Sequence, residues 1–307
     1  MYTKFFKKTF VLLCVISTII TLYLLIYKNQ IGRIKVNKNI KVIVCGDSHT
    51  QCAINDSLLK HTLNISQNSE PYLATYNVIR TITYTNPQIK TVILGYSYHS
   101  LSEVFDEIVY QEKHKVDFYS RYLPILDIES IALIGSHNFA GIIKSFPKSL
   151  NFWITLRNLT NSNSINYNNY RFFGEYYSSK KSNCNSKTIK SSINRHYYNG
   201  KSVKRFSNIQ QKYLLKIIHY CFKNKLKIIL LNTPISNKYN EKTPNKFKNK
   251  YYSTVRKLEK IAPLIDLHDL KLKNKYFGDG DHINIYGAQV LKSKLDSVLF
   301  KDYKIKL

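Results

Sequence analysis

A strand that ends in a serine is the first feature of this sequence whose residues could do chemistry. Residues 41–45 are mostly apolar and are followed at once by Gly46, Asp47 and Ser48, a pattern typical of a buried strand entering a tight turn. Open α/β sheets bind ligands at that edge. A serine just before a helix has unpaired backbone N–H groups beside it, which suits a developing oxyanion. A turn followed by a serine N-cap fits the same residues, so the serine alone leaves both interpretations open.

A loop near the C-terminus supplies the partners that a serine nucleophile needs. Residues 276–288 are rich in Gly and Asp, hold the single histidine His282, and open a helix. A nucleophilic serine requires a base, and the base requires an orienting acid. Asp279 lies three residues before His282, so its carboxylate can reach one ring nitrogen while the other faces Ser48. We predict Ser48, His282 and Asp279 as the catalytic residues. There are two alternatives: Asp281 could be the orienting acid, or His282 could only cap a helix.

These two motifs together resemble the SGNH (GDSL-type) hydrolase superfamily. Gly-Asp-Ser after the first strand and Asp-x-x-His near the end agree with that family in order and separation, over roughly residues 40–300. The resemblance implies ester chemistry through an acyl-enzyme, in which Ser48 attacks, His282 moves the proton and Asp279 orients the ring. The form Gly-Asp-Ser-His also looks like the SGNH domains attached to polysaccharide O-acetyltransferases.

One family segment is missing. After the apolar run 91–95, SGNH proteins carry Gly-x-Asn-Asp, whose Asn donates to the oxyanion, and this chain has no such Asn. The remaining oxyanion candidates are the Ser48 N–H, the turn that contains Ser97 and His99, and the backbone around Ser69. His99 also fits a polar residue packed beside a turn.

Spacing of apolar residues predicts the elements that would position these groups. Strands are expected at 41–45, at about 64–66, and at 91–95, 226–232 and 263–267, with helices between them and a last helix over 288–298. Such alternation predicts an α/β fold: a flavodoxin-like three-layer α/β/α arrangement with a parallel five-stranded sheet. The order 2-1-3-4-5 would bring Ser48, His99 and His282 together.

The segment from about 100 to 205 lacks this alternation and is expected to be a lid-like insertion. It should contain a helix over 120–134 and a polar loop region over 158–200. Its aromatic residues between 170 and 177 fit either a small hydrophobic cluster under a loop or a surface that stacks on sugar rings.

Residues 9–27 carry no charge and are about as long as a bilayer core requires. Lys4, Lys7 and Lys8 precede them and no small-x-small cleavage site follows, which favours an uncleaved signal anchor with its N-terminus in the cytoplasm. The expected organisation is therefore a tip and transmembrane anchor over 1–30, a linker over 31–39, and a catalytic domain over 40–307 outside the cytoplasm.

Composition limits the partners. The 307 residues include 47 Lys+Arg against 19 Asp+Glu, a formal charge of +28, which favours anionic polymers or lipids. We expect no nucleic-acid partner, because no helix-turn-helix, zinc-finger or RRM signature is present. The lysines are also scattered among Asn, Ile and Tyr, as an AT-biased genome would produce.

No cofactor and no metal are expected from the sequence. The Asp-x-Asp-His run could suggest a divalent ion, but it lacks further ligands at a suitable spacing. Five cysteines without C-x-x-C do not indicate a disulfide framework, and pairing of Cys184 with Cys221 stays open.

Three functions fit these features. The first is a membrane-anchored serine esterase that removes acyl groups, acetyl in particular, from a cell-envelope glycan. The second is an O-acyltransferase that modifies an envelope polysaccharide with the same residues. The third is a non-enzymatic binding or assembly protein on a degenerate SGNH scaffold.

Overall fold

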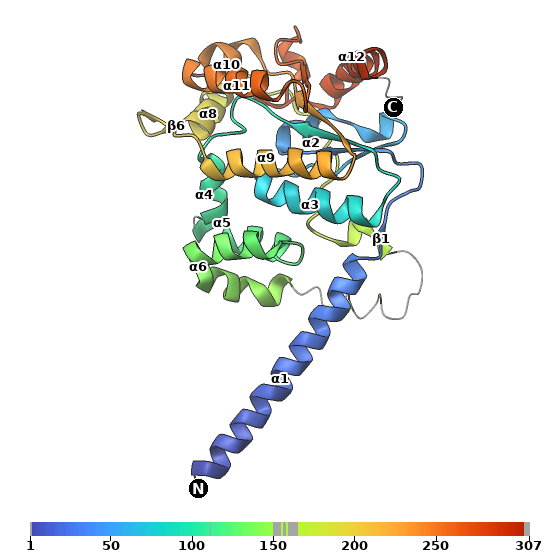
Figure 1. Ribbon diagram of the computed structural model, residues 1–307. Coiled ribbons are helices and arrows are strands. Elements are labelled where there is room, and N and C mark those ends of the chain that lie inside the picture. The colour runs from blue at the N-terminus through green and yellow to red at the C-terminus, as the bar shows by residue number, and fades with distance from the viewer. Residues whose placement is uncertain (1, 111, 150–154, 156–157, 159–164, 304–307) are drawn as a thin grey trace.

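A parallel five-stranded sheet forms the centre of the protein (Figure 1). The structure is a computed structural model that describes residues 2–110, 112–149, 155, 158 and 165–303. The strands of the sheet lie in the order β3-β2-β4-β8-β9, and every neighbouring pair is parallel. They are β2 (Val42–Cys45), β3 (Thr62–Asn64), β4 (Thr91–Gly95), β8 (Lys227–Asn232) and β9 (Leu264–Asp266). The predicted α/β class and strand order are confirmed.

Alternate residues of the strands face two separate hydrophobic cores. Ile43 belongs to the larger core and Val44 to the smaller one, as the two-residue period of a strand requires. Both faces are covered by helices, which explains why the strands read as continuous apolar runs rather than as alternating ones.

Helices complete the outer layers. On one face α3 (Tyr72–Thr85) and α9 (Asn208–Lys223) lie side by side (Figure 1), and α11 (Asn245–Leu258) adds Phe247 and Tyr251 to the same core. On the other face α12 (Ile285–Tyr303) contacts the short helix α2 (Ser48–Ala53). The remaining elements of this part are η1 (Asp56–Leu58), α10 (Asn237–Lys242) and η3 (Asn274–Tyr276).

The insertion between β4 and α9 is more helical than its sequence suggests. The helix expected over 120–134 is wrong: one helix ends at Tyr122 and the next begins at Ile128, with Pro124 between them, because the residue before a proline avoids helical geometry. The polar stretch expected as a loop contains a helix that begins with a capping box on Asn185. The described elements are α4 (Val104–Tyr110), α5 (Glu112–Tyr122), α6 (Ile128–Ser149), β5 (Ile165–Asn166), η2 (Tyr167–Asn169), α8 (Ser186–Tyr197), β6 (Tyr198–Asn199) and β7 (Ser202–Val203).

Aromatic residues of the insertion fill the core rather than line a surface. Tyr170, Phe172 and Phe173 are all buried in the larger hydrophobic cluster. The hydrophobic-cluster interpretation therefore holds for these three, whereas Tyr177 is exposed.

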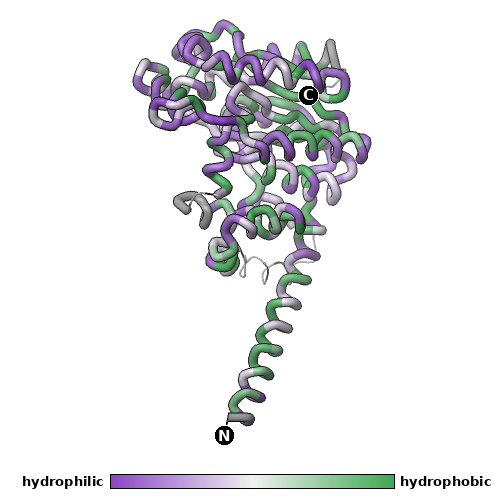
Figure 2. Tube along the Cα trace, turned by 60° about the vertical axis from the view of Figure 1, so that its left-hand side comes forward, coloured by the Kyte–Doolittle hydropathy of each residue, from purple (hydrophilic) through white to green (hydrophobic). Residues whose placement is uncertain are grey.

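The N-terminal helix α1 (Tyr2–Ile31) projects from the domain and is mostly apolar between its lysine-bearing ends (Figures 1 and 2). Within Lys4–Ile31 an 18-residue window has a mean hydropathy of 2.6, and the helix is long enough to cross a membrane. Its last turns pack on the domain, where Tyr27 and Ile31 are buried and the Gln30 amide donates to the backbone carbonyl of Thr155.

Residues 31–39, expected as a linker, are fixed to the domain. The short strand β1 (Ile34–Lys35) pairs in parallel with β5, and Ile34 is completely buried. The Asn86 side chain accepts from the Val36 N–H and donates to the Ile34 carbonyl. The domain therefore follows directly on α1, without a free tether.

Candidate active site

The turn after β2 requires a glycine. Gly46 has φ +142, and a Cβ there would lie 2.7 Å from the Thr50 hydroxyl oxygen and 3.2 Å from the Cα of Gly95. Only glycine tolerates this backbone geometry and this approach of two strand ends. The Asp47 carboxylate then caps the next helix by accepting from the His49 N–H at 3.0 Å. Ser48 is thereby the first residue of α2, and its own N–H has no acceptor within the helix.

The structure brings the three predicted catalytic residues into contact. The Ser48 Oγ lies 2.8 Å from Nε2 of His282, and Nδ1 of His282 lies 2.9 Å and 3.0 Å from the two carboxylate oxygens of Asp279. The backbone N–H groups of Asp281 and His282 donate to the same carboxylate and hold it in place. An acceptor at Nδ1 selects the tautomer whose Nε2 lone pair points at the serine hydroxyl, as a general base requires.

Two carboxylates raise the pKa of His282. Burial alone lowers this pKa, but the charge of Asp281 and the hydrogen bond and charge of Asp279 outweigh burial and raise it to about 9. The Asp281 Oδ1 lies 3.6 Å from Nδ1 of the ring. His282 therefore holds its proton strongly once it has taken one, and it is a free base only in alkaline solution.

The oxyanion candidates lie in different surroundings. The Ser97 N–H donates to the Ser100 hydroxyl, and His99 Nε2 lies 2.7 Å from the Asp47 carboxylate. Ser69 is exposed, with φ +58, and its hydroxyl donates to the Asn68 side chain. The Ser97 amide and the His99 Nε2 are thus committed to other acceptors. The Ser48 N–H therefore stays a predicted oxyanion donor. The contacts of Ser69, Ser97 and His99 do not identify a second oxyanion donor.

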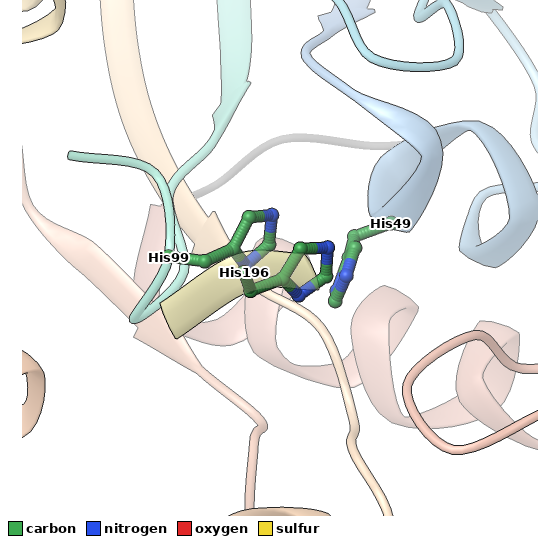
Figure 3. A group of neighbouring side chains, drawn as sticks. All are labelled: His49, His99 and His196. Carbon is green, nitrogen blue, oxygen red and sulfur yellow. The ribbon is translucent and has the colours of Figure 1, made fainter. Parts of the chain in front are cut away.

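A buried group of histidines lies beside the three predicted residues. Sequence reasoning placed His99 near Ser48 but missed His49 and His196. The rings of His49, His99 and His196 are neighbours, from α2, from the loop after β4 and from α8 (Figure 3). The ring centroids of His99 and His196 are 4.3 Å apart, and those of His49 and His99 are 4.4 Å apart. All three are at most 7% exposed.

Asp281 joins this histidine group to the predicted catalytic residues. Its side chain is fully buried, and its Oδ2 lies 3.2 Å from His49 Nε2 and 3.5 Å from both Arg195 and His196. The signals in the sequence were the histidine directly after Ser48, the acid beside His282, and His99, which the predicted strand order places near Ser48. His196 lies in the insertion, whose path could not be predicted.

Burial and neighbouring side chains shift the pKa values of the histidines and of Asp281. Burial lowers the pKa of His49, and the neighbouring His99 lowers it further; burial also lowers that of His196, well below its usual range. Burial by itself raises the pKa of Asp281, but His282, His49 and His196 outweigh it and hold that pKa well below its usual range. The uncharged rings of His49 and His196 thus lie beside an ionised carboxylate.

A surface hollow lies beside this region but contains none of the three predicted catalytic residues. Its volume is about 830 Å³, and its walls come from η3, α12 and the insertion. Its lining residues are Ser182, Lys275, Tyr276, Tyr286, Gln289, Val290 and Ser293.

Comparison with known proteins finds no matching family model and no matching curated protein. Among solved structures, the chain is similar to a candidate acylhydrolase from Bacteroides fragilis, with 12% identity and a TM-score of 0.38 over 90% of this chain and 94% of that one. It is also similar to a structure described as a candidate platelet activating factor from Streptococcus pneumonia, with 11% identity and a TM-score of 0.42 over 95% of this chain and 99% of that one. Likenesses this distant do not by themselves support an inference about activity.

Proposed function

We propose that this protein is a serine esterase of the SGNH type that removes acyl groups, acetyl in particular, from a glycan of the cell envelope. The observation that carries the proposal is the chain of contacts from Ser48 Oγ through both nitrogens of His282 to the Asp279 carboxylate. Serine, base and orienting acid in that order are the arrangement of acyl-transfer enzymes on several unrelated folds.

The first half of the reaction forms an acyl-enzyme. Ser48 Oγ attacks the ester carbonyl carbon while His282 Nε2 takes the hydroxyl proton, and the Ser48 N–H stabilises the oxyanion. Asp279 stabilises the imidazolium. When the tetrahedral intermediate collapses, the C–O bond to the sugar breaks and His282 returns its proton to the departing sugar oxygen.

The second half regenerates the serine. A water molecule gives a proton to His282 Nε2 and attacks the acyl carbon. The bond from that carbon to Ser48 Oγ then breaks, His282 returns the proton to Ser48 Oγ, and the carboxylic acid leaves. If a sugar hydroxyl replaces the water, the same steps transfer the acyl group to that sugar. The Gly-Asp-Ser-His form of residues 46–49 favours this transfer as the second candidate function.

The proposed glycan substrate and the proposed location are inferred from the N-terminal helix and from the lysines at its N-terminal end. A helix able to span a membrane precedes the domain, and three lysines lie at its N-terminal end. We propose that these lysines keep the N-terminus in the cytoplasm and place the domain outside, where envelope glycans are found. A reporter fused after Leu307 should be active outside the cytoplasm; activity only inside would overturn this orientation.

The test is covalent labelling of the full-length protein in detergent. A serine-directed fluorophosphonate should label the wild type and Ser57→Ala but not Ser48→Ala, because Ser57 is an exposed serine that lies outside the proposed site. Small acetyl esters should be hydrolysed with the same pattern. A folded wild-type protein that is neither labelled nor active would reject the esterase and support the binding or assembly protein. Acetyl transfer to added oligosaccharide in preference to water would instead favour the acyltransferase.

A further inference from the structure

A row of exposed apolar side chains runs along the second half of α6. The backbone leaves helical geometry at Asn138. In the helical segment that follows, Phe139, Ile143 and Pro147 are exposed at four-residue spacing, which places them on one face. Phe139 is 68% exposed and Ile143 is 57% exposed. A single exposed apolar side chain is common on soluble proteins, but a row of them indicates a surface that contacts something.

The opposite face of α6 already packs on the domain. Ile134 is completely buried, and Ile142 belongs to the larger hydrophobic core. The Ser130 hydroxyl accepts from the Asn77 amide of α3 and lies 2.9 Å from the Tyr213 hydroxyl of α9. A surface helix needs only one apolar face to stay attached to its own domain. The exposed face of α6 therefore needs a different explanation.

The position of α6 in the fold indicates what this face meets. Helix α6 lies at the end of the domain from which α1 projects, whereas α10, α11 and α12 lie at the other end (Figure 1). Helix α5 packs against α6 and lies on its inner side (Figure 1). The exposed face of α6 is thus directed away from the domain, at the end where α1 leaves it.

The domain begins before the apolar part of α1 ends. The uncharged stretch over 9–27 is about 28 Å long as a helix, which is close to the thickness of a bilayer core. Yet the Tyr23 hydroxyl lies 3.0 Å from the Thr155 hydroxyl, and the Tyr27 ring packs against the Tyr170 ring. With α1 across a bilayer, these two tyrosines therefore hold the domain directly at the bilayer surface.

The attachment after α1 also leaves the domain no freedom to move away. Gln30 and Ile31 at the end of the helix are buried in the domain, and the strand β1 follows within three residues and pairs with β5. The elements at this end of the domain, α6 among them, stay within reach of the lipid headgroups.

The charges on α6 suit the surface of a bilayer that contains anionic lipids. Lys144 and Lys148 are exposed in the same segment as the apolar row. The only acid in α6 is Glu129, and its carboxylate pairs with Lys212 and Lys216 of α9. Helices that lie in a bilayer surface combine an apolar face with lysines that reach anionic headgroups.

We infer that α6 lies in the surface of the bilayer that α1 crosses, with Phe139 and Ile143 inserted between the lipids and Lys144 and Lys148 at the headgroups. This inference rests on the proposed location of α1 in a membrane. The domain then has two attachments, α1 and α6. Because two attachments fix its orientation, the site of Ser48 keeps one direction relative to the membrane.

The experiment measures quenching of tryptophan fluorescence by lipids with brominated acyl chains. The only tryptophan of the chain is first removed by Trp153→Phe. Phe139→Trp then probes α6, Leu13→Trp probes α1, and Val290→Trp is the matched control at an exposed apolar position of α12. The full-length proteins are reconstituted in vesicles of phosphatidylcholine and phosphatidylglycerol.

Brominated lipids should lower the emission about twofold or more at positions 13 and 139 and leave it unchanged at position 290, because a surface helix reaches about 5–10 Å into the boundary between headgroups and acyl chains. Ile143→Trp should behave as Phe139→Trp does. Replacing phosphatidylglycerol by phosphatidylcholine should reduce the quenching at position 139. In Lys144→Gln with Lys148→Gln, this dependence on anionic lipid should disappear.

The probe in α1 separates this inference from the proposed location. Quenching at position 13 without quenching at positions 139 and 143 would overturn the role of α6 and keep α1 in the membrane. No quenching at position 13 would overturn both. A blue-shifted emission at position 139 that brominated lipids do not quench would show that a protein surface, such as a second copy of the chain, covers this face instead. Fluorophosphonate labelling of Ser48 is read in the same samples, so the esterase proposal can fail independently.

Discussion

Asp279 and Asp281 lie two residues apart on one loop and serve different networks. Asp279 is 35% exposed in its side chain and contacts the His282 ring at the partly open Ser48 site. Asp281 is fully buried in its side chain and contacts His49, Arg195 and His196. One carboxylate thus faces groups that could react, and its neighbour faces groups that connect three parts of the fold.

The difference shows what short-range spacing can and cannot predict. A carboxylate three residues before a histidine reaches that ring through the local path of one loop. A carboxylate one residue before it stays near the ring through one oxygen, with Asp281 Oδ1 3.6 Å from His282 Nδ1, but the partners of its other oxygen depend on the path of distant segments. The predictions below separate the two networks, from the largest expected effect to the smallest.

Ser48→Ala and His282→Ala should each reduce turnover of a small acetyl ester by about 10³- to 10⁶-fold. Residues that act as one unit lose nearly the whole effect when either is removed. The measurement is kcat/KM for both single variants and for the double variant. A double variant much slower than either single variant would show that the two residues do not act together.

Asp279→Asn should reduce turnover by about 10³- to 10⁴-fold in a protein that stays folded, since an amide favours the wrong tautomer of His282. Asp281→Asn should reduce the turnover of folded molecules far less and should instead lower the melting temperature. It removes a buried charge that faces His49, Arg195 and His196 and that also raises the pKa of His282. Activity and melting temperature are measured for both. Equal losses of activity would contradict the division between the two networks.

Turnover should also depend on pH through His282. A general base must be unprotonated, and the pKa of this ring is raised to about 9. Well below that value the neutral fraction falls tenfold per pH unit, and at the pKa it is one half, so kcat/KM should rise about 50-fold between pH 7 and pH 9. In Asp279→Asn the residual activity should rise at a lower pH, because one of the groups that raises the pKa is gone. An unchanged profile in that variant would show that Asp279 does not act on the ring.

The sequence predicted those parts of the fold and site that depend on local patterns. Apolar runs gave the five parallel strands and their order, and the residues after β2 and near the C-terminus indicated Ser48, Asp279 and His282. It did not predict His196 as a neighbour of His49, because they are 147 residues apart and α8 lies in the insertion. Nor did it predict the break at Pro124. Both depend on tertiary contacts of a segment without regular periodicity.

Glu70 provides the smallest and most specific test of why Asp281 stays ionised. It is as buried as Asp281, but its Oε2 accepts from the Tyr122 hydroxyl and its Oε1 has no partner. Burial raises its pKa to about 8, although Thr75, Tyr122 and the charge of Arg121 oppose the shift. The folded state therefore holds this proton more tightly than the unfolded state, so Glu70 contributes stability that is complete below about pH 4 and is lost as the pH rises through about 8.

Glu70→Gln should consequently change the pH dependence of stability and not the activity of the folded protein. Glutamine cannot ionise, so the melting temperature of the variant relative to the wild type should increase by a few degrees between pH 5 and pH 9. Tyr122→Phe is the matched control: it removes the hydroxyl that Glu70 accepts from and should leave the ionisable group in place. Parallel melting curves for Glu70→Gln and wild type across this range would mean that Glu70 is ionised in the fold. A buried carboxylate would then be ionised even without the basic partners that surround Asp281. Those partners would not explain why Asp281 is ionised.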